Sequence, residues 1–351
     1  MHAHRPVSAP RRILVRLPNW LGDVLMARPL LHGMRRAHPG AEVRAVGPAA
    51  LLGLLFPERT FDGASAWPAR QAPGSRRPRA EERERVVSEM RAWRPDAALV
   101  LPFSFSSAWF AHRTGATIRV GYAHELRSPL LTHALRRPAR GEQHLSREYL
   151  ALGGPIGVGP LPSADPLPPL IPPPEAEAAA AGLIARAVPD AARLAVMAPR
   201  SAYGPAREWP VDRFAALARR LVGRGLAVIV CGTAAERETC RRIAAEAGPG
   251  VASLAGETDL PTLAALVRRA TVAVCNDSGL AHLAGAVGAA TVTLYGSTSS
   301  AWTAALGPRV RVLQHPPVCS PCFRRTCRIG YRCLTGLGLD EVDGACREAG
   351  A

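Results

Sequence analysis

The chain has 351 residues, a length that favours two hydrophobic cores over one. Hydrophobic residues make up 48% of it, enough to build such cores, so a largely disordered protein is excluded. The formal net charge of +16, carried mainly by arginine, indicates an acidic partner: a membrane surface, a phosphorylated substrate or a nucleic acid. Because the arginines are spread over many predicted helices, a generally basic surface is favoured over a dedicated nucleic-acid arm.

No segment has the pattern of a membrane span or a secretory signal. The longest apolar runs, such as residues 49–56 and 97–101, are far shorter than a bilayer requires. The leader, residues 1–11, carries basic residues but no apolar core, so it does not read as a signal peptide. The sequence therefore predicts a cytoplasmic protein, and peripheral attachment to an anionic membrane stays open.

Strand and helix patterns alternate through the first part of the chain. Apolar runs predict strands at residues 12–17, 42–46, 97–101 and 117–120. A helix with one apolar face is predicted over residues 23–37, and a second helix ends near Trp93. Residues 70–79, rich in Pro and Arg, form a predicted surface excursion before that second helix.

Nine prolines between residues 153 and 174 interrupt the pattern, so residues 153–175 read as a linker. The alternation then restarts, with predicted strands at 194–197, 226–231, 272–275 and 291–295 and helices at 211–222, 234–247 and 260–269. This organisation predicts an α/β protein with two doubly wound, Rossmann-like domains, residues 12–152 and 176–351. Ligands bind beyond the carboxyl ends of strands in such sheets, so we expect the site in a cleft between the domains.

The most informative segment is the turn Asn276-Asp277-Ser278-Gly279-Leu280-Ala281-His282, which lies between a predicted strand and a predicted helix. A strand, a polar turn and a helix in this order aim backbone N–H groups at an anion. Asp277 or Ser278 can cap the helix, and Gly279 lets a ligand approach the chain closely. A second polar turn, residues 296–299, follows the next strand. Ordinary connections between strands and helices are the alternative interpretation, since single Gly/Ser turns are weak evidence.

Polar residues also follow other predicted strands. The turn with Asn19, Trp20, Gly22 and Asp23 lacks the glycine spacing of a dinucleotide fingerprint. Asp23 is either a helix cap or a carboxylate that acts as a general base for an incoming hydroxyl.

In the second domain, Arg200 and Arg207 are placed to neutralise a diphosphate. Glu236 is placed to accept hydrogen bonds from ribose hydroxyls, with an ordinary first-turn helix acid as the alternative. His282, one turn into its helix, either contacts phosphate or ribose or is a buried structural residue.

Four of the eight cysteines lie close together near the C-terminus: Cys319, Cys322, Cys327 and Cys333. Four close thiols in a cytoplasmic chain suggest a structural zinc site more readily than disulfides, although the spacing is not that of a standard zinc ribbon or finger. Packed or redox-active thiols are the alternative. The arginines among these cysteines could instead contact acceptor phosphates or a membrane surface. No catalytic role is assigned to this segment.

Several of these segments together resemble the ADP-heptose:lipopolysaccharide heptosyltransferases of glycosyltransferase family 9, most of all their heptosyltransferase II branch. The motifs that carry the resemblance keep their order along the chain: residues 17–24, residues 120–122, His144 with Tyr149, residues 204–210 and residues 276–282.

The resemblance implies a GT-B fold, with the acceptor held mainly by the first domain and the nucleotide-sugar by the second. It implies inverting, metal-independent transfer of a heptose from ADP-L-glycero-D-manno-heptose to the inner core of lipopolysaccharide. No cofactor and no nucleic acid are expected, and the protein would be a monomer on the inner face of the inner membrane.

The resemblance also assigns residue roles. Asp23 falls on the family's catalytic aspartate, and Asn19, Trp20 and Gly22 surround it on the acceptor side. The donor-binding turn supplies Asp277, Ser278, Gly279, Leu280 and His282. Arg207 stands where relatives commonly carry a lysine near the diphosphate, so the positive charge is kept.

Two other functions stay open on the residues alone. One is a GT-B enzyme that uses another nucleotide-sugar donor, or an epimerase of that fold. The other is a zinc-dependent nucleic-acid-binding protein built on the Cys/Arg segment, which would bind DNA or RNA in a salt-sensitive way. That alternative leaves the turn at residues 276–282 without a purpose.

Overall fold

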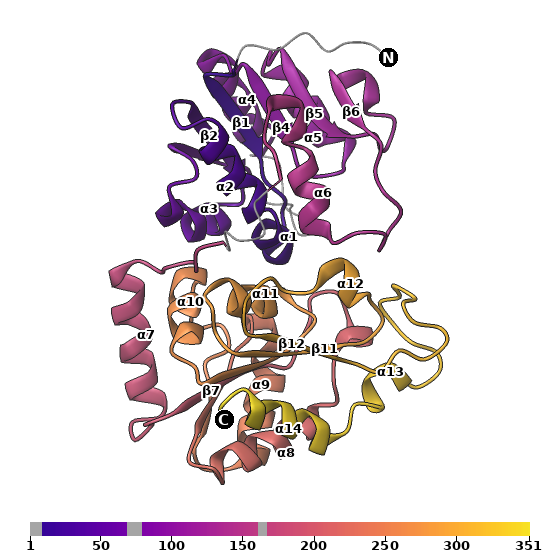
Figure 1. The fold of residues 1–351 in the computed structure, drawn as a ribbon. Coiled ribbons are helices and arrows are strands. Elements are labelled where there is room, and N and C mark those ends of the chain that lie inside the picture. Colours follow the sequence, from indigo (N-terminus) through magenta and orange to yellow (C-terminus); the bar gives the residue numbers. More distant parts are fainter. Residues whose placement is uncertain (1–8, 69–78, 161–166) are drawn as a thin grey trace. The chain divides into compact units, whose positions relative to one another are not determined.

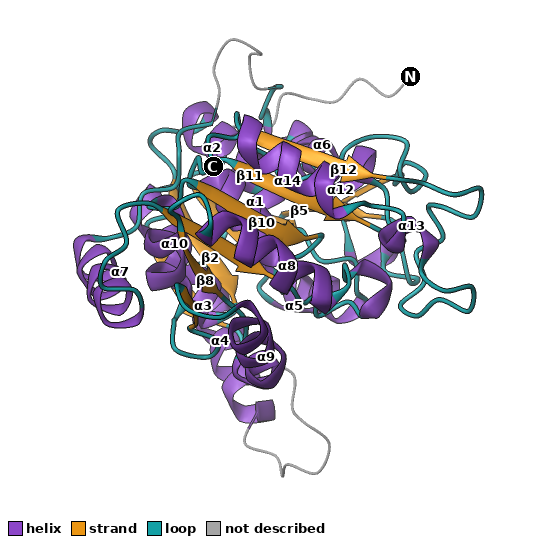
Figure 2. Cartoon of the chain, turned by 90° about the horizontal axis from the view of Figure 1, so that it is seen from below, coloured by secondary structure: helices purple, strands orange, loops and turns teal. Residues whose placement is uncertain are grey.

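The computed structural model describes residues 9–68, 79–160 and 167–351, so most of the predicted excursion at 70–79 and of the leader at 1–11 lies outside it. The chain divides into two compact units, Met1–Pro168 and Pro169–Ala351. The division falls within the stretch 153–175 that the prolines marked as a linker. Each unit consists of strands flanked by helices (Figures 1 and 2).

The first unit is built on a six-stranded parallel sheet in the order β3-β2-β1-β4-β5-β6. Its strands are β1 (Arg12–Arg16), β2 (Glu42–Gly47), β3 (Gly63–Ala66), β4 (Ala97–Val100), β5 (Ile118–Tyr122) and β6 (His133–Leu135). The register pairs Val15 of β1 with Ala45 of β2 and with Leu99 of β4. Central strands β1 and β4 are almost wholly buried, as expected for a parallel sheet with both faces covered.

The helices of the first unit are α1 (Leu21–Met26), α2 (Arg28–Ala37), α3 (Ala49–Leu55), α4 (Arg79–Trp93), α5 (Phe105–Arg113) and α6 (Leu145–Ala151), with short 3₁₀ turns η1 (Phe56–Glu58), η2 (Ser128–Leu130) and η3 (Gly154–Ile156). The single helix predicted over residues 23–37 is wrong, because the chain forms two helices that meet at Ala27. Pro29 explains the interruption, since its ring removes a backbone donor and is tolerated only in the first turn of a helix.

The second unit has a six-stranded parallel sheet in the order β12-β11-β10-β7-β8-β9. Its strands are β7 (Leu194–Ala198), β8 (Ala227–Val230), β9 (Val251–Ser253), β10 (Val272–Asn276), β11 (Thr291–Tyr295) and β12 (Val310–Gln314). Its helices are α7 (Pro174–Ala187), α8 (Val211–Val222), α9 (Arg237–Ala247), α10 (Leu260–Arg268), α11 (Gly279–Ala286), α12 (Ser300–Thr303), α13 (Arg332–Thr335) and α14 (Leu339–Glu348), with 3₁₀ turns η4 (Pro205–Arg207) and η5 (Ala234–Glu236).

Each unit has its own hydrophobic core. In the first, Leu14 of β1 and Val100 of β4 pack with Met90 of α4 and Phe110 of α5. In the second, the core includes Trp209, Phe214 and Leu221 beside Val228 and Val274 of the sheet. In the described part of the chain no helix is long and apolar enough to cross a membrane.

The parallel sheets explain why polar turns from distant parts of the sequence meet. Strand β10 pairs with β7 on one side and with β11 on the other. All three strands run the same way, so the segments that follow them emerge side by side at the carboxyl edge of the sheet. These segments are residues 199–210 after β7, 277–278 after β10 and 296–299 after β11.

Candidate functional site

The centre of the site in the second unit is the carboxylate of Asp277, directly after β10. Asp277 is buried, and its Oδ2 lies 3.1 Å from Nη1 of Arg207. The hydroxyl of Thr298, from the turn after β11, donates a hydrogen bond to the same oxygen. Burial raises the pKa of the Asp277 carboxyl, while the Arg207 charge, and then the Thr298 and Tyr295 hydroxyls, act in the opposite direction. Three separate turns therefore supply one buried ionic cluster.

Asn276 fastens this cluster to the segment after β7. Its side chain is fully buried, and its Nδ2 donates to the carbonyl of Pro199 at 2.6 Å. Its Oδ1 accepts from the backbone N–H of Trp209 at 3.0 Å. The hydroxyl of Ser201 donates to the carbonyl of Asp277 at 3.0 Å. Asn276 thus holds the two ends of the 199–210 segment, which carries Arg207, against the end of β10.

Two buried polar atoms beside the cluster lack a hydrogen-bond partner among the described residues: Nε of Arg207 and Oγ of Ser278. Ser278 is the N-cap residue of α11, yet its hydroxyl does not cap the helix. Backbone N–H groups of the first turn of an α-helix have no partner within the helix, and they attract anions. Since unpaired buried polar groups are rare in folded proteins, these donors indicate a site for an anionic ligand.

The remaining predicted donor residues lie along this edge with different partners. Leu280 and His282 are buried in α11, where His282 is one turn from Ser278. Glu236 accepts a hydrogen bond from the backbone N–H of Thr233 at 2.7 Å and completes a capping box, the helix role given above as its alternative. Arg200 forms an ion pair with Glu208 at 2.5 Å, so Arg207 is the arginine that faces Asp277.

In the first unit, Asp23 lies in the first turn of α1, and Trp20 is the N-cap residue of that helix. The buried Tyr149 lies close enough to Asp23 for its hydroxyl to interact with the Asp23 carboxylate. Burial and then the Asp23 charge raise the pKa of Tyr149 well above its usual value. Tyr149 was part of a sequence motif, but no sequence pattern identifies it as the partner of Asp23.

Other residues that support the Asp23 region could not be identified from the sequence. Nη2 of Arg16, at the end of β1, donates to Oδ1 of Asn19 at 3.0 Å. Arg16 is buried, and burial lowers its pKa to about 10. Arg137 pairs with the buried Glu148 at 2.9 Å, and its guanidinium lies 3.7 Å from the ring centroid of Phe103.

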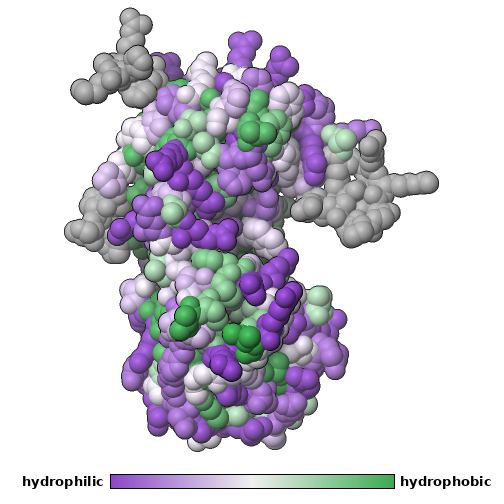
Figure 3. Space-filling view, turned by 90° about the vertical axis from the view of Figure 1, so that its right-hand side faces the viewer, coloured by the Kyte–Doolittle hydropathy of each residue, from purple (hydrophilic) through white to green (hydrophobic). Residues whose placement is uncertain are grey.

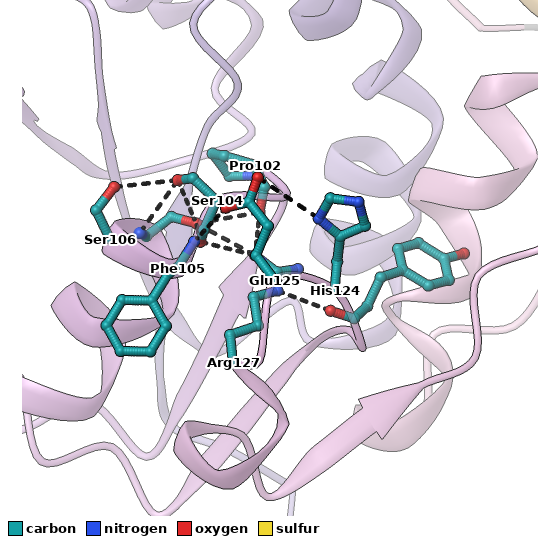
Figure 4. A network of polar contacts seen from close by, with 9 residues as sticks. Pro102, Ser104, Phe105, Ser106, His124, Glu125 and Arg127 are labelled. Carbon is teal, nitrogen blue, oxygen red and sulfur yellow. Dashed lines mark hydrogen bonds and ion pairs between the residues drawn. The ribbon is translucent and has the colours of Figure 1, made fainter.

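A further polar network fixes the loop after β5 against the start of α5 (Figure 4). Arg127 is fully buried and donates from Nε to the carbonyl of Tyr122 at 2.7 Å and from Nη1 to the hydroxyl of Ser107 at 3.2 Å. Glu125 Oε2 accepts from the backbone N–H of Phe105, the first residue of α5, at 3.0 Å. This network rigidifies the carboxyl ends of β4 and β5.

The four clustered cysteines are free thiols that range from exposed (Cys319 and Cys322) through partly buried (Cys327) to buried (Cys333). In residues 9–68, 79–160 and 167–351, no three His, Cys, Asp or Glu side chains are arranged to hold a metal ion. The geometry therefore gives the zinc hypothesis no support.

Comparison with known proteins identifies the family of the chain. The model of glycosyltransferase family 9 (heptosyltransferase) matches residues 83–332, more than half of the chain. The chain belongs to glycosyltransferase family 9. It is 30% identical over 309 residues to lipopolysaccharide heptosyltransferase 2 of Salmonella typhimurium, covering 86% of this chain and 88% of that protein.

Solved structures of family 9 proteins give the same result for the fold. The chain superposes on E. coli ADP-heptose lps heptosyltransferase II with a TM-score of 0.82 and 25% identity, over 96% of this chain and 98% of that one. It matches an E. coli heptosyltransferase determined with ADP with a TM-score of 0.74 and 20% identity, over 96% and 99% of the two chains, a likeness of fold. The expected GT-B fold, the glycosyltransferase class and the kinship with heptosyltransferase II are confirmed.

Proposed function

We propose that this family 9 enzyme transfers a heptose from ADP-L-glycero-D-manno-heptose to the inner core of lipopolysaccharide with inversion of configuration. One observation carries the donor half of the proposal: beside the start of α11, Arg207 and Ser278 hold buried donors that have no partner among the residues that the structure describes. A diphosphate is the anionic group that such an arrangement fits. The names of the relatives, which include ADP-heptose for the E. coli structure, support the choice of nucleotide and sugar.

On the donor side, the chemistry needs positive potential where the diphosphate leaves. As the bond between the anomeric carbon and the diphosphate breaks, negative charge collects on the departing ADP. Arg207 and the first-turn N–H groups of α11 would stabilise that charge without a divalent cation. We assign donor contacts to Ser278, Gly279, Leu280 and His282, and a ribose contact to Glu236. Asp277 holds Arg207 in place through their ion pair.

On the acceptor side, Asp23 would act as the general base. Its carboxylate takes the proton of the acceptor hydroxyl while that oxygen attacks the anomeric carbon from the face opposite to the diphosphate. The hydroxyl of Tyr149, which interacts with this carboxylate, would orient it. Asn19, Trp20 and Gly22 are the assigned acceptor contacts. Trp20, which is 66% exposed, offers an apolar surface for a sugar ring.

A lipid-linked acceptor requires the enzyme to work at a membrane surface. The net charge of +16 supports peripheral attachment to the anionic inner face of the inner membrane. The exposed aromatic residues Phe105 and Trp109 lie four positions apart on α5, and hence on one side of that helix. Aromatic side chains of this kind favour the membrane interface. A cytoplasmic monomer attached in this way completes the proposal.

Calorimetric titration of the purified chain with ADP, UDP, GDP and ADP-heptose tests the donor. Selective binding of ADP and ADP-heptose, unchanged by a chelator, is expected. Preference for UDP or GDP would leave the family assignment intact but overturn the proposed donor. An acceptor assay with the Asp23→Asn variant then tests the base. Turnover close to that of the wild type would show that another group takes the proton.

A further inference from the structure

The Cys-rich segment, residues 319–333, is built into the donor site by main-chain hydrogen bonds. The backbone N–H of Ala206, next to Arg207, donates to the carbonyl of Arg325 at 3.1 Å. The backbone N–H of Phe323 donates to the carbonyl of Ser297 at 2.8 Å, and that of Ser297 donates to the carbonyl of Ala206 at 3.0 Å. The segment thus links the turn that carries Arg207 to the turn that carries Thr298.

Side chains strengthen this link around one aromatic ring. Arg325 donates from Nε to the carbonyl of Tyr203 at 2.6 Å and from Nη2 to the carbonyl of Ala202 at 3.3 Å. The hydroxyl of Tyr203 donates in return to the carbonyl of Phe323. The Arg207 guanidinium lies 3.9 Å from the centroid of the Tyr203 ring, and that of Arg325 lies 5.7 Å from it. The ring therefore contacts both arginines.

The backbone is shaped to let the segment approach this closely. Gly204 has a φ of 135°, and a Cβ at this position would lie 2.8 Å from the carbonyl oxygen of Arg325. Gly296 is equally constrained, because its Cβ would lie 2.4 Å from the carbonyl oxygen of Ala206. In addition, Trp302 of α12 packs edge-on against Phe323 with ring centroids 5.7 Å apart. A loosely attached loop would need none of these contacts.

We propose that Arg325 and Tyr203 are positioning residues that hold the Arg207 guanidinium in place for the diphosphate of the donor. A free arginine side chain samples many rotamers, and ordering it on ligand binding costs entropy. Contact with the Tyr203 ring on one side and the ion pair with Asp277 on another restrict Arg207 before the donor arrives. The Cys-rich segment thereby acquires a function in donor binding. This inference rests on the proposed function in that Arg207 is the diphosphate ligand.

The test compares two arginines of the same segment. Arg325 and Arg328 are both exposed, and Arg325 alone of these two contacts Tyr203 in the described structure. We expect Arg325→Met to weaken ADP binding and raise the donor KM by roughly 10- to 100-fold, with the acceptor KM unchanged. Arg328→Met should match the wild type. Tyr203→Leu should weaken ADP binding similarly, and combining it with Arg325→Met should add little, because both changes disturb one unit.

The outcomes separate this inference from the proposed function. If the wild type does not bind ADP, the proposed function fails. If the wild type binds ADP and Arg325→Met binds it equally well, the positioning role is overturned. Thermal unfolding of each variant identifies a general loss of structure. If Arg325→Met does not fold, Tyr203→Phe provides the milder test, because it keeps the ring under Arg207 and removes only the hydrogen bond to Phe323. We expect an intermediate loss of ADP affinity for Tyr203→Phe, and wild-type affinity would contradict the positioning role.

Discussion

Burying a carboxylate such as Asp277 lowers the stability of the folded protein unless charged and polar partners surround it. Arg207 and Thr298 supply those partners from turns that are distant in sequence. The ion pair therefore does two things at once. It makes the buried Asp277 tolerable, and it orients a guanidinium beside the start of α11.

The first prediction concerns the pH dependence of this pair. Arg207→Met should lower the free energy of unfolding by about 3 kcal/mol at pH 8 and by less at pH 5. The pKa of Asp277 is already raised in the fold, and Arg207 opposes the rise. A carboxyl with a raised folded-state pKa contributes stability that is present below its unfolded pKa, about 3.9, and is lost as pH rises through the folded value. Removing Arg207 raises the pKa of Asp277 in the folded state further, so the free energy of unfolding that the variant loses must grow with pH.

Urea unfolding at the two pH values measures this effect. Arg200→Met is the matched control, since its ion pair with Glu208 is more exposed on the arginine side. An equal loss of stability at pH 5 and pH 8 in Arg207→Met would contradict the role given to the ion pair.

The second prediction concerns the proposed base. Tyr149→Phe removes a hydroxyl that interacts with the Asp23 carboxylate. We expect kcat to fall about tenfold, because the proposed base loses a polar group that orients it. Tyr122→Phe is the control, because that hydroxyl donates to the backbone carbonyl of Glu148 instead. An equal fall of kcat in both variants would assign the effect to packing.

At the scale of elements, α11 presents its N-terminus to the site because it packs very closely against the connection between α12 and β12. Gly285 makes this possible: a Cβ there would lie 2.4 Å from the carbonyl oxygen of Leu306. Gly307 approaches from the other side, where its Cβ would lie 2.6 Å from the carbonyl oxygen of Gly285. Close backbone contact, rather than a particular side chain, sets the position of this helix.

The third prediction follows from that contact. Gly285→Ala should destabilise the protein by about 1–3 kcal/mol, because the added methyl group has no space. Gly182→Ala, in α7, is the matched control, since no heavy atom lies within 4 Å of its Cβ position. It should stabilise the protein by about 0.5–1 kcal/mol through helix propensity. Thermal unfolding of both variants measures this difference. Gly182→Ala should have the higher Tm.

The sequence predicted central elements well and edge elements poorly. Strands β1, β7 and β10 contain continuous apolar runs, and such runs are the pattern of a buried parallel strand. Edge strands β3 (Gly63–Ala66) and β9 (Val251–Ser253) are short and only partly buried, so their residues carry little hydrophobic signal. They form because a neighbouring strand offers backbone hydrogen-bond partners. Those partners are distant in the sequence, so the residues of the edge strand itself do not reveal them.

The same distinction applies to the site. The turn at residues 276–282 could be identified because its signal is contiguous: an apolar strand, a polar turn and a helix. The contacts of Asp277 could not be identified, since Thr298 belongs to another turn and Arg207 is 70 positions away. Tyr149 and Arg325 were missed for the same reason. Strand order brings these groups together, and no periodicity in the sequence encodes strand order.

For the whole molecule, the most consequential property is charge. All 44 residues counted as Lys or Arg are arginines, against 28 acidic residues. Arginine stays charged at any physiological pH and binds phosphate in a bidentate manner. On the face shown in Figure 3, hydrophilic and hydrophobic residues are intermixed rather than separated into large areas.

The fourth prediction concerns this charge. Binding to vesicles that contain anionic lipid should be strong at low salt and fall steeply as ionic strength rises, because phosphate-rich surfaces attract the basic protein electrostatically. Vesicles of zwitterionic lipid serve as the control and should bind weakly at all salt concentrations. Cosedimentation measures both. Binding that is equal for the two vesicle types would assign attachment to apolar contacts such as those of Phe105 and Trp109.

The contact between Trp302 and Phe323 can be followed by tryptophan fluorescence and by NMR. An indole that packs edge-on against another aromatic ring senses any change in that contact through ring currents and through changes in its emission. The chain has six tryptophans, so fluorotryptophan labelling yields a fluorine spectrum simple enough to assign by replacing Trp302 with phenylalanine. The Trp302 signal would then follow, in solution and without any modification of the binding residues, how tightly residues 319–333 hold to the rest of the second unit as nucleotide is added.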